Sequence, residues 1–190
     1  MKKSIAPKPV VYPTPVFVVG TYDAAGRPNG ATVAWGGICC SRPPCVAVSL
    51  RKATYSHGNI VARGAFTVNV PSERYTAEAD FFGIVSGRHV DKFAATGLTP
   101  VRSERVDAPI IQEFPLALEC RLLQTVEIGL HTQFIGEIVG IQADESVVGE
   151  KDVLDIEKVR PILYAPDNAA YFAIGPGVGQ AFSVGKRFGG

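Results

Sequence analysis

Short apolar runs separated by glycine, proline and other turn residues recur along most of the chain, and helical periodicity is confined to short segments. The runs predict strands over residues 16–22, 30–39, 45–50, 65–70, 117–125, 132–142, 162–164 and 170–174. Within 117–125, Leu118, Cys120 and Leu122 alternate with Glu119 and Arg121. The two sets are therefore expected on opposite faces of the strand.

Helical segments are predicted over residues 56–63, 72–84 and 90–95. Gly64 and Gly97 follow the first and the last of them, as stop signals do. Gly136 and Gly140 lie inside the longest predicted strand. Glycines inside a strand are typical of bends and of close approaches between backbones.

Many strands and few short helices, without alternation of strand and helix, favour a mainly β fold, an antiparallel barrel or sandwich with short helical insertions. A doubly wound dinucleotide fold is not expected, because no G-x-G-x-x-G follows the first strand. We interpret residues 1–190 as a single domain. Four prolines make residues 1–15 an extended arm, and residues 175–190 form a glycine-rich tail.

Composition excludes several classes of function. The formal net charge is only +1, which argues against a general nucleic-acid surface. No apolar run is long enough for a membrane span, and the proline-rich start does not have the pattern of a secretory signal, so a cytoplasmic protein is expected. Apolar residues make up 46% of the chain, which hints at a buried dimer face or a lipophilic ligand.

The four cysteines are Cys39, Cys40, Cys45 and Cys120. No pair has C-x-x-C spacing and no matching set of histidines accompanies them, so no metal site is expected. Reduced, partly buried thiols are favoured over a redox pair. A disulfide between the adjacent Cys39 and Cys40 would need an unusual backbone.

Two polar runs and one aromatic residue could bind a ligand. Arg51, Thr54, Tyr55 and Asn59 surround a predicted helix start, where a phosphate would find N–H groups and a cation. A solvated turn explains the same residues from composition alone. Residues 86–93 form a second cationic run, and an exposed loop is again the simpler interpretation.

The only tryptophan, Trp35, precedes two glycines on a predicted strand. A planar ring could lie along that strand edge, and a core or interface position is about equally compatible with the sequence. The three histidines, His57, His89 and His131, are not accompanied by a nucleophile elbow, so a classical hydrolytic site is not expected.

Taken together and in order, these features resemble the flavin reductase-like, FMN-binding split-barrel family, in particular its flavoredoxin type. The matching segments are YPTPV (12–16), GTYD (20–23), TVAWGGICCSRPP (32–44), SLR (49–51) with Thr54, Tyr55 and Asn59, VSGR (85–88) with DKF (91–93), and GLHTQFIGEI (129–138). They extend over nearly the whole chain, and the ordered set is more specific than any one segment.

The resemblance implies a Greek-key split barrel that forms a homodimer and holds one FMN per subunit without a covalent link. The cofactor-binding residues that it implies are Thr32, Val33, Ala34 and Trp35 along the ring, Ser49, Leu50 and Arg51 along the ribityl chain, and Arg51, Thr54, Tyr55, Asn59, Arg88 and Lys92 around the phosphate. His131 matches a histidine near the ring or the nicotinamide. Leu130 stands where many reductases have Asp, so direct use of NAD(P)H is an open question.

The function implied is that of a flavoprotein that transfers electrons, with NAD(P)H or a redox partner protein as donor. This implies an oxidoreductase, although the residues alone do not decide whether the chain is an enzyme. The alternatives are an FMN-binding or flavin-storage protein without its own turnover, and a structural dimer with a vestigial pocket.

Overall fold

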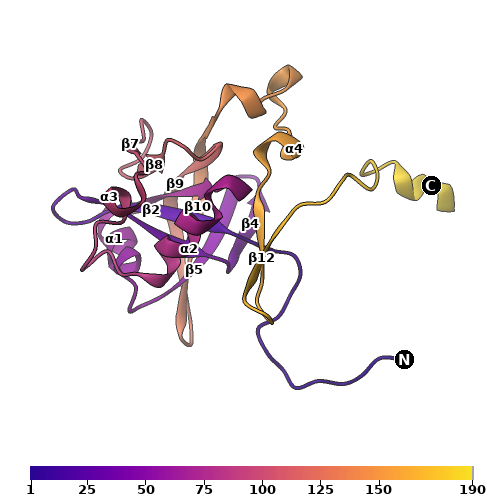
Figure 1. The fold of residues 1–190 in the computed structure, drawn as a ribbon, viewed down its shortest axis with the longest axis horizontal. Helices are drawn as coiled ribbons and strands as arrows, with labels where there is room; N and C mark the ends of the chain where they lie inside the picture. The colour runs from indigo at the N-terminus through magenta and orange to yellow at the C-terminus, as the bar shows by residue number, and fades with distance from the viewer. Residues whose placement is uncertain (190) are drawn as a thin grey trace.

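A seven-stranded antiparallel sheet organises the chain in the computed structural model, which describes residues 1–189 (Figure 1). The strand order is β3-β2-β6-β9-β10-β5-β4. These strands are β2 (Phe17–Tyr22), β3 (Pro28–Val33), β4 (Gly36–Ser41), β5 (Pro44–Arg51), β6 (Ala65–Val70), β9 (Leu116–Ile128) and β10 (His131–Ala143). The mainly β fold class is confirmed.

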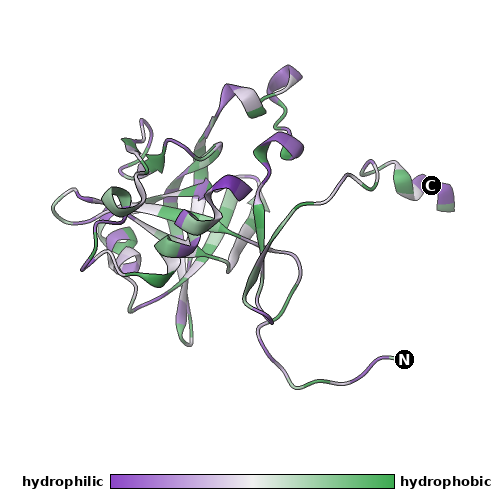
Figure 2. Cartoon of the chain, in the orientation of Figure 1, coloured by the Kyte–Doolittle hydropathy of each residue, from purple (hydrophilic) through white to green (hydrophobic). Residues whose placement is uncertain are grey.

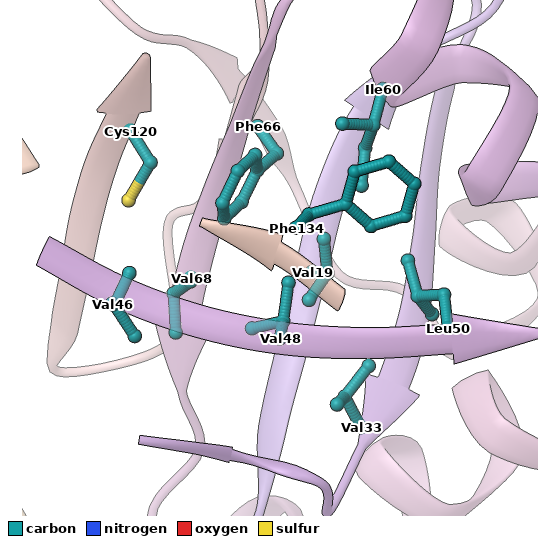
Figure 3. Packing of buried hydrophobic residues seen from close by; sticks show 10 residues of the cluster. All are labelled: Val19, Val33, Val46, Val48, Leu50, Ile60, Phe66, Val68, Cys120 and Phe134. Carbon is teal, nitrogen blue, oxygen red and sulfur yellow. The ribbon is translucent and has the colours of Figure 1, made fainter. Parts of the chain in front are cut away.

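The sheet is rolled around one apolar interior. Side chains from β2, β3, β5, β6, β9 and β10 meet in a single buried cluster, which a flat sheet would spread over its whole width (Figure 3). Phe66 and Phe134 are fully buried within it. Figure 2 shows the apolar positions concentrated along the strands that enclose this core. Burial of apolar surface on this scale is the main force that holds such a fold together.

Helices cover the outside of the rolled sheet. Those that pack against it are α1 (Tyr55–Arg63), α2 (Thr76–Ile84) and α3 (Lys92–Thr96). The other helical segments are α4 (Ile156–Val159) and the 3-10 turns η1 (Glu73–Tyr75), η2 (Glu145–Val147), η3 (Glu150–Asp152) and η4 (Val184–Phe188), the last of which lies in the segment that extends away after β12 (Ala170–Ala173) (Figure 1). Gly64 and Gly97 end α1 and α3 in the left-handed conformation, at φ +62° and +72°, which confirms both stop signals. Phe82 and Phe93 anchor α2 and α3 in a second core cluster.

Two small sheets complete the fold. One pairs β1 (Thr14–Pro15), β11 (Ile162–Ala165) and β12 (Ala170–Ala173), and the other pairs β7 (Pro100–Arg102) with β8 (Pro109–Ile111). The start of the chain and the segment after β12 extend away from these sheets (Figure 1). Within residues 1–189, no helix has the length and apolar character needed to cross a membrane.

Residues 30–39, expected as one strand, form parts of two. The strand breaks at Ala34 and Trp35, so that β3 and β4 lie at opposite edges of the seven-stranded sheet. Gly36 lies where the chain passes from one edge to the other. A side chain would not fit there, because a Cβ would lie 2.9 Å from the carbonyl oxygen of Ala47. The strands β7 and β8 were not predicted, since each is only three residues long.

Alternation along β9 is confirmed on one face and incomplete on the other. Leu118, Cys120 and Leu122 all belong to the first core cluster or pack against it. Glu119, expected on a polar face, has an exposed fraction of 0%. The connection between β7 and β8 covers it, and Ser103 Oγ donates to Glu119 Oε1 over 2.6 Å. This hydrogen bond compensates part of the desolvation of the buried carboxyl group.

Gly136 and Gly140 lie at irregularities in the pairing of β10 with β9, as predicted. At Gly136 the interior leaves no room for a side chain, because an added Cβ would lie 2.5 Å from Phe66 Cζ and 2.9 Å from Cys120 Cβ. The bend in β10 therefore also serves the packing of the core.

Replacing Gly136 with Ala should lower the free energy of unfolding by about 1–3 kcal/mol, because the added methyl overpacks the core. Gly37→Ala is the matched control, since a Cβ at this position in β4 meets nothing within 4 Å. Urea denaturation of both variants measures the difference. Equal stability of the two variants would contradict the assigned close packing.

Candidate functional site

A cavity of about 320 Å³ lies where α1 begins, between the strands β3 and β5 and the end of α2. The roll of the sheet brings β3 and β5 together there, although other strands separate them in the sheet order. The lining residues are Asn29, Ala31, Thr32, Leu50, Arg51, Ala53, Thr54, Tyr55, Ser56, Phe82, Gly83, Ile84, Val85, Ser86, Gly87 and Lys92.

The charge of this lining has one sign. Arg51 and Lys92 are its two cations, and none of its residues is a carboxylate. The dipole of α1 adds positive potential at the start of the helix, and no acidic residue in its first turn compensates it. Thr54, at the N-cap position, does not cap the helix with its side chain; its hydroxyl donates to the Arg51 carbonyl over 2.8 Å. The start of α1 is thus suited to an anion.

Lys92 is a buried cation between two elements. Its side chain reaches from α3 to the end of α2 and to β3, where Nζ donates to the carbonyls of Phe82 and Gly30, each over 2.8 Å. The residue is only 4% exposed, and burial lowers the pKa of its ammonium group to about 8. An ammonium group has three N–H donors, so one remains after these two bonds.

Tyr55 is held from two sides. Its hydroxyl donates to Asp23 Oδ2 over 2.9 Å, and the Arg88 guanidinium lies 5.3 Å from its ring centroid. Arg88 in turn donates to the carbonyl of Ala53 over 2.8 Å. Burial alone would raise the pKa of Asp23, but hydrogen bonds from Arg27, Tyr55 and the Ala25 amide outweigh it and hold that pKa at about 2.

Asn29 and Gly87 form the tightest wall of the cavity. Asn29 Nδ2 donates to Ser56 Oγ over 2.8 Å, while its Oδ1 is buried and has no hydrogen-bond partner among residues 1–189. A Cβ at Gly87 would collide with that oxygen, so only glycine allows the backbone to approach so closely. Sequence reasoning missed Asn29 and Ser56 as site residues.

The structure brings together about half of the residues predicted to bind the cofactor. Those that line the cavity are Thr32, Leu50, Arg51, Thr54, Tyr55 and Lys92. Val33 is instead a core residue, and Asn59 is buried on α1, where its Nδ2 donates to Thr21 Oγ1 over 3.1 Å. The remaining predicted residues, Ala34, Trp35, Ser49, Arg88 and His131, do not contribute to the lining.

Three of these remaining residues, Ser49, Arg88 and His131, lie next to residues that do line the cavity, namely Leu50, Gly87 and Arg51. The Ser49 amide donates to the Trp35 carbonyl over 2.8 Å, across the break between β3 and β4. Trp35 itself is partly exposed. His131, at the start of β10, pairs directly with Arg51 of β5. Their roles toward a ligand stay predictions.

Residues 10–172 match the model of the flavin reductase like domain. The chain belongs to this family. It is similar to flavoredoxin of Desulfovibrio vulgaris (Miyazaki F), with 52% identity, a TM-score of 0.94, and coverage of 98% of this chain and 100% of that one. It is also similar to flavoredoxin from Methanosarcina acetivorans, with 30% identity, a TM-score of 0.92, and 99% of each chain covered.

An uncharacterised protein of Aeropyrum pernix is 32% identical over 82% of this chain. The chain spans only 58% of that relative's length. The flavin reductase-like family and its split-barrel fold are thus confirmed as the sequence predicted, and flavin binding is the chemistry that the family name describes.

Asp23→Asn should flatten the loss of stability in acid. The pKa of Asp23 is lower in the folded chain than its ordinary value, so its charge contributes stability above pH 4 that is lost as the pH falls toward 2. The free energy of unfolding, measured with urea from pH 5 to pH 2.5, should fall less steeply for the variant. If the two curves are parallel, the ionisation of Asp23 does not contribute to the loss of stability in acid.

Proposed function

We propose that the chain binds FMN non-covalently in the cavity at the start of α1 and passes electrons through it, as a redox protein of the flavoredoxin and flavin reductase type. The observation that carries the proposal is the one-signed lining, with Arg51, Lys92 and the start of α1 facing a cavity without carboxylates. An FMN phosphate carries close to two negative charges near neutral pH, which this lining would compensate.

The other lining residues also suit FMN. Leu50, Phe82 and Ile84 offer apolar surface, and Thr32 and Ser86 offer hydroxyls. The buried Oδ1 of Asn29 lacks a donor, and a flavin nucleotide has N–H and O–H donors. When bound, the flavin supplies the electron or hydride chemistry, and the chain's residues hold, orient and shield it.

Arg51→Ala should weaken FMN binding by about 10- to 100-fold, as expected for the loss of a charge-assisted hydrogen bond. Lys52→Ala is the matched control, because Lys52 is the next residue and an exposed cation, pairs with Glu127 and does not line the cavity. Quenching of flavin fluorescence on titration of apoprotein measures both affinities.

Riboflavin, which lacks the phosphate, should bind the wild type and the Arg51 variant about equally. A protein that takes up no FMN would contradict the proposed function. FMN uptake with equal affinities for the Arg51 and Lys52 variants would contradict only the place assigned to the phosphate.

Electron transfer from NAD(P)H and from a protein donor can be separated directly. The FMN-loaded protein is mixed anaerobically with NADH or NADPH while the visible flavin band is followed. We expect slow or no bleaching, since Leu130 precedes His131 where many reductases have Asp. Rapid bleaching that His131→Gln slows would instead indicate a reductase with His131 at the nicotinamide. Reduction by dithionite but by no biological donor would favour the flavin-storage alternative.

We further propose that two copies of the chain pair through the outer face of the β9–β10 ribbon. Leu123 and Ile128 of β9 and Leu130 of the turn that follows are each more than half exposed there, and exposed apolar residues close together mark an interface. Sedimentation of the FMN-loaded protein should give the mass of a dimer, and the mass of a single chain would contradict the pairing.

A further inference from the structure

The hairpin of β4 and β5 places two cysteines opposite each other at its closed end. Cys40 of β4 pairs with Cys45 of β5, and Ser41 pairs with Pro44 just before the turn. Directly opposed residues of an antiparallel pair have Cα atoms about 4.5–5.5 Å apart and side chains on the same face. A disulfide needs a Cα separation of about 4.4–6.8 Å.

A bulge decides which of the two adjacent cysteines faces Cys45. The pairing of Ile38 with Val46 is followed by that of Cys40 with Cys45, so Cys39 is the extra residue on β4. In an unbroken register Cys39, not Cys40, would be opposite Cys45. Because of this bulge, Cys40 faces Cys45 and the adjacent Cys39 does not.

Both sulfur atoms are directed to the same turn. Cys40 Sγ donates to the Arg42 carbonyl over 3.3 Å, and Cys45 Sγ donates to the next carbonyl, that of Pro43, over 3.4 Å. Both cysteines are free thiols in the structure. Burial raises the pKa of the Cys45 thiol, and the neighbouring Cys40 and Cys39 thiols raise it further.

The two thiols differ in access. Cys40 is exposed, whereas Cys45 has an exposed fraction of only 2%. An exposed thiol next to a sheltered partner is the arrangement in which one sulfur meets an oxidant and the other resolves the product. No cluster of three or more potential metal ligands is present among residues 1–189, so a metal-binding role for these thiols is not supported.

We propose that Cys40 and Cys45 form a reversible dithiol–disulfide pair that exchanges with low-molecular-weight disulfides. The Cys40 thiolate attacks one sulfur of the small disulfide, which forms a mixed disulfide and releases one thiolate. The Cys45 thiolate then attacks Cys40 Sγ and releases the second. Two cysteine thiols are oxidised, one small disulfide is reduced to two thiols, and the two cysteine protons pass to the leaving thiolates.

The experiment counts thiols and does not depend on bound flavin. Reduced protein is equilibrated without oxygen in glutathione buffers of increasing oxidised fraction, then unfolded in acid and alkylated. Intact mass should show four alkylated cysteines in the reduced buffer and, in the oxidised buffer, an internal disulfide of Cys40 and Cys45 beside glutathione on no cysteine other than the exposed Cys39. Cys39→Ser should still lose two thiols, from three to one.

Cys40→Ser and Cys45→Ser should form no internal disulfide, and Cys45→Ser should carry glutathione on Cys40. If Cys45→Ser does not fold, as judged by circular dichroism, the contrast between the Cys39 and Cys40 variants decides alone. The proposal is overturned if the wild type keeps four thiols, or if Cys39→Ser stops at a glutathione adduct. It is also overturned by loss of two thiols without an adduct in Cys40→Ser, or by disulfide-linked dimers on a non-reducing gel.

Discussion

The shared interior of the rolled sheet is the constraint on which the rest of the molecule depends. Six strands direct side chains into one cluster, and this requires β10 to bend where Gly136 lies against Phe66. Because the sheet closes around this cluster, β3 and β5 approach each other on the outside. The cavity at the start of α1 exists only where these two strands, α2 and α1 converge.

The positions of charged residues make the lining of the cavity cationic. The sequence has almost balanced charge, so the cationic lining is a result of placement and not of composition. Carboxylates close to the site are kept out of the cavity by other partners. Asp23 is held by Tyr55 and Arg27, and Glu127 pairs with Lys52. Nearby negative charge is thus compensated by neighbouring groups, while Arg51 and Lys92 are left to line the cavity.

Local signals in the sequence were strong enough to predict most elements. Gly64 and Gly97 end helices as expected, and Gly136 and Gly140 mark bends. Prediction was poorer where contacts between distant residues decide whether a side chain is buried or where a strand ends. The burial of Glu119 depends on the distant Ser103, and the break at Trp35 depends on which sheet edge β4 joins. Neither contact leaves a pattern in neighbouring residues.

The same distinction applies to the candidate site. Arg51, Thr54 and Tyr55 were found because a helix start beside a strand end has a local signature. Asn29 and Ser56 were missed, because their pairing joins residues 27 positions apart, and a single asparagine has many simpler explanations than a ligand site. Resemblance to a family supplied Lys92, which from charge alone would belong on the surface.

The two hydrogen bonds of Lys92 have a kinetic consequence. Nζ already joins the carbonyls of Gly30 and Phe82, so the wall formed by β3 and α2 is assembled before any ligand arrives. At neutral pH the ammonium group is mostly charged, since its pKa is about 8. An entering anion thus meets a fixed charge, and little reorganisation of the protein accompanies binding. Association would then be limited by entry of the anion into the cavity and not by assembly of this wall.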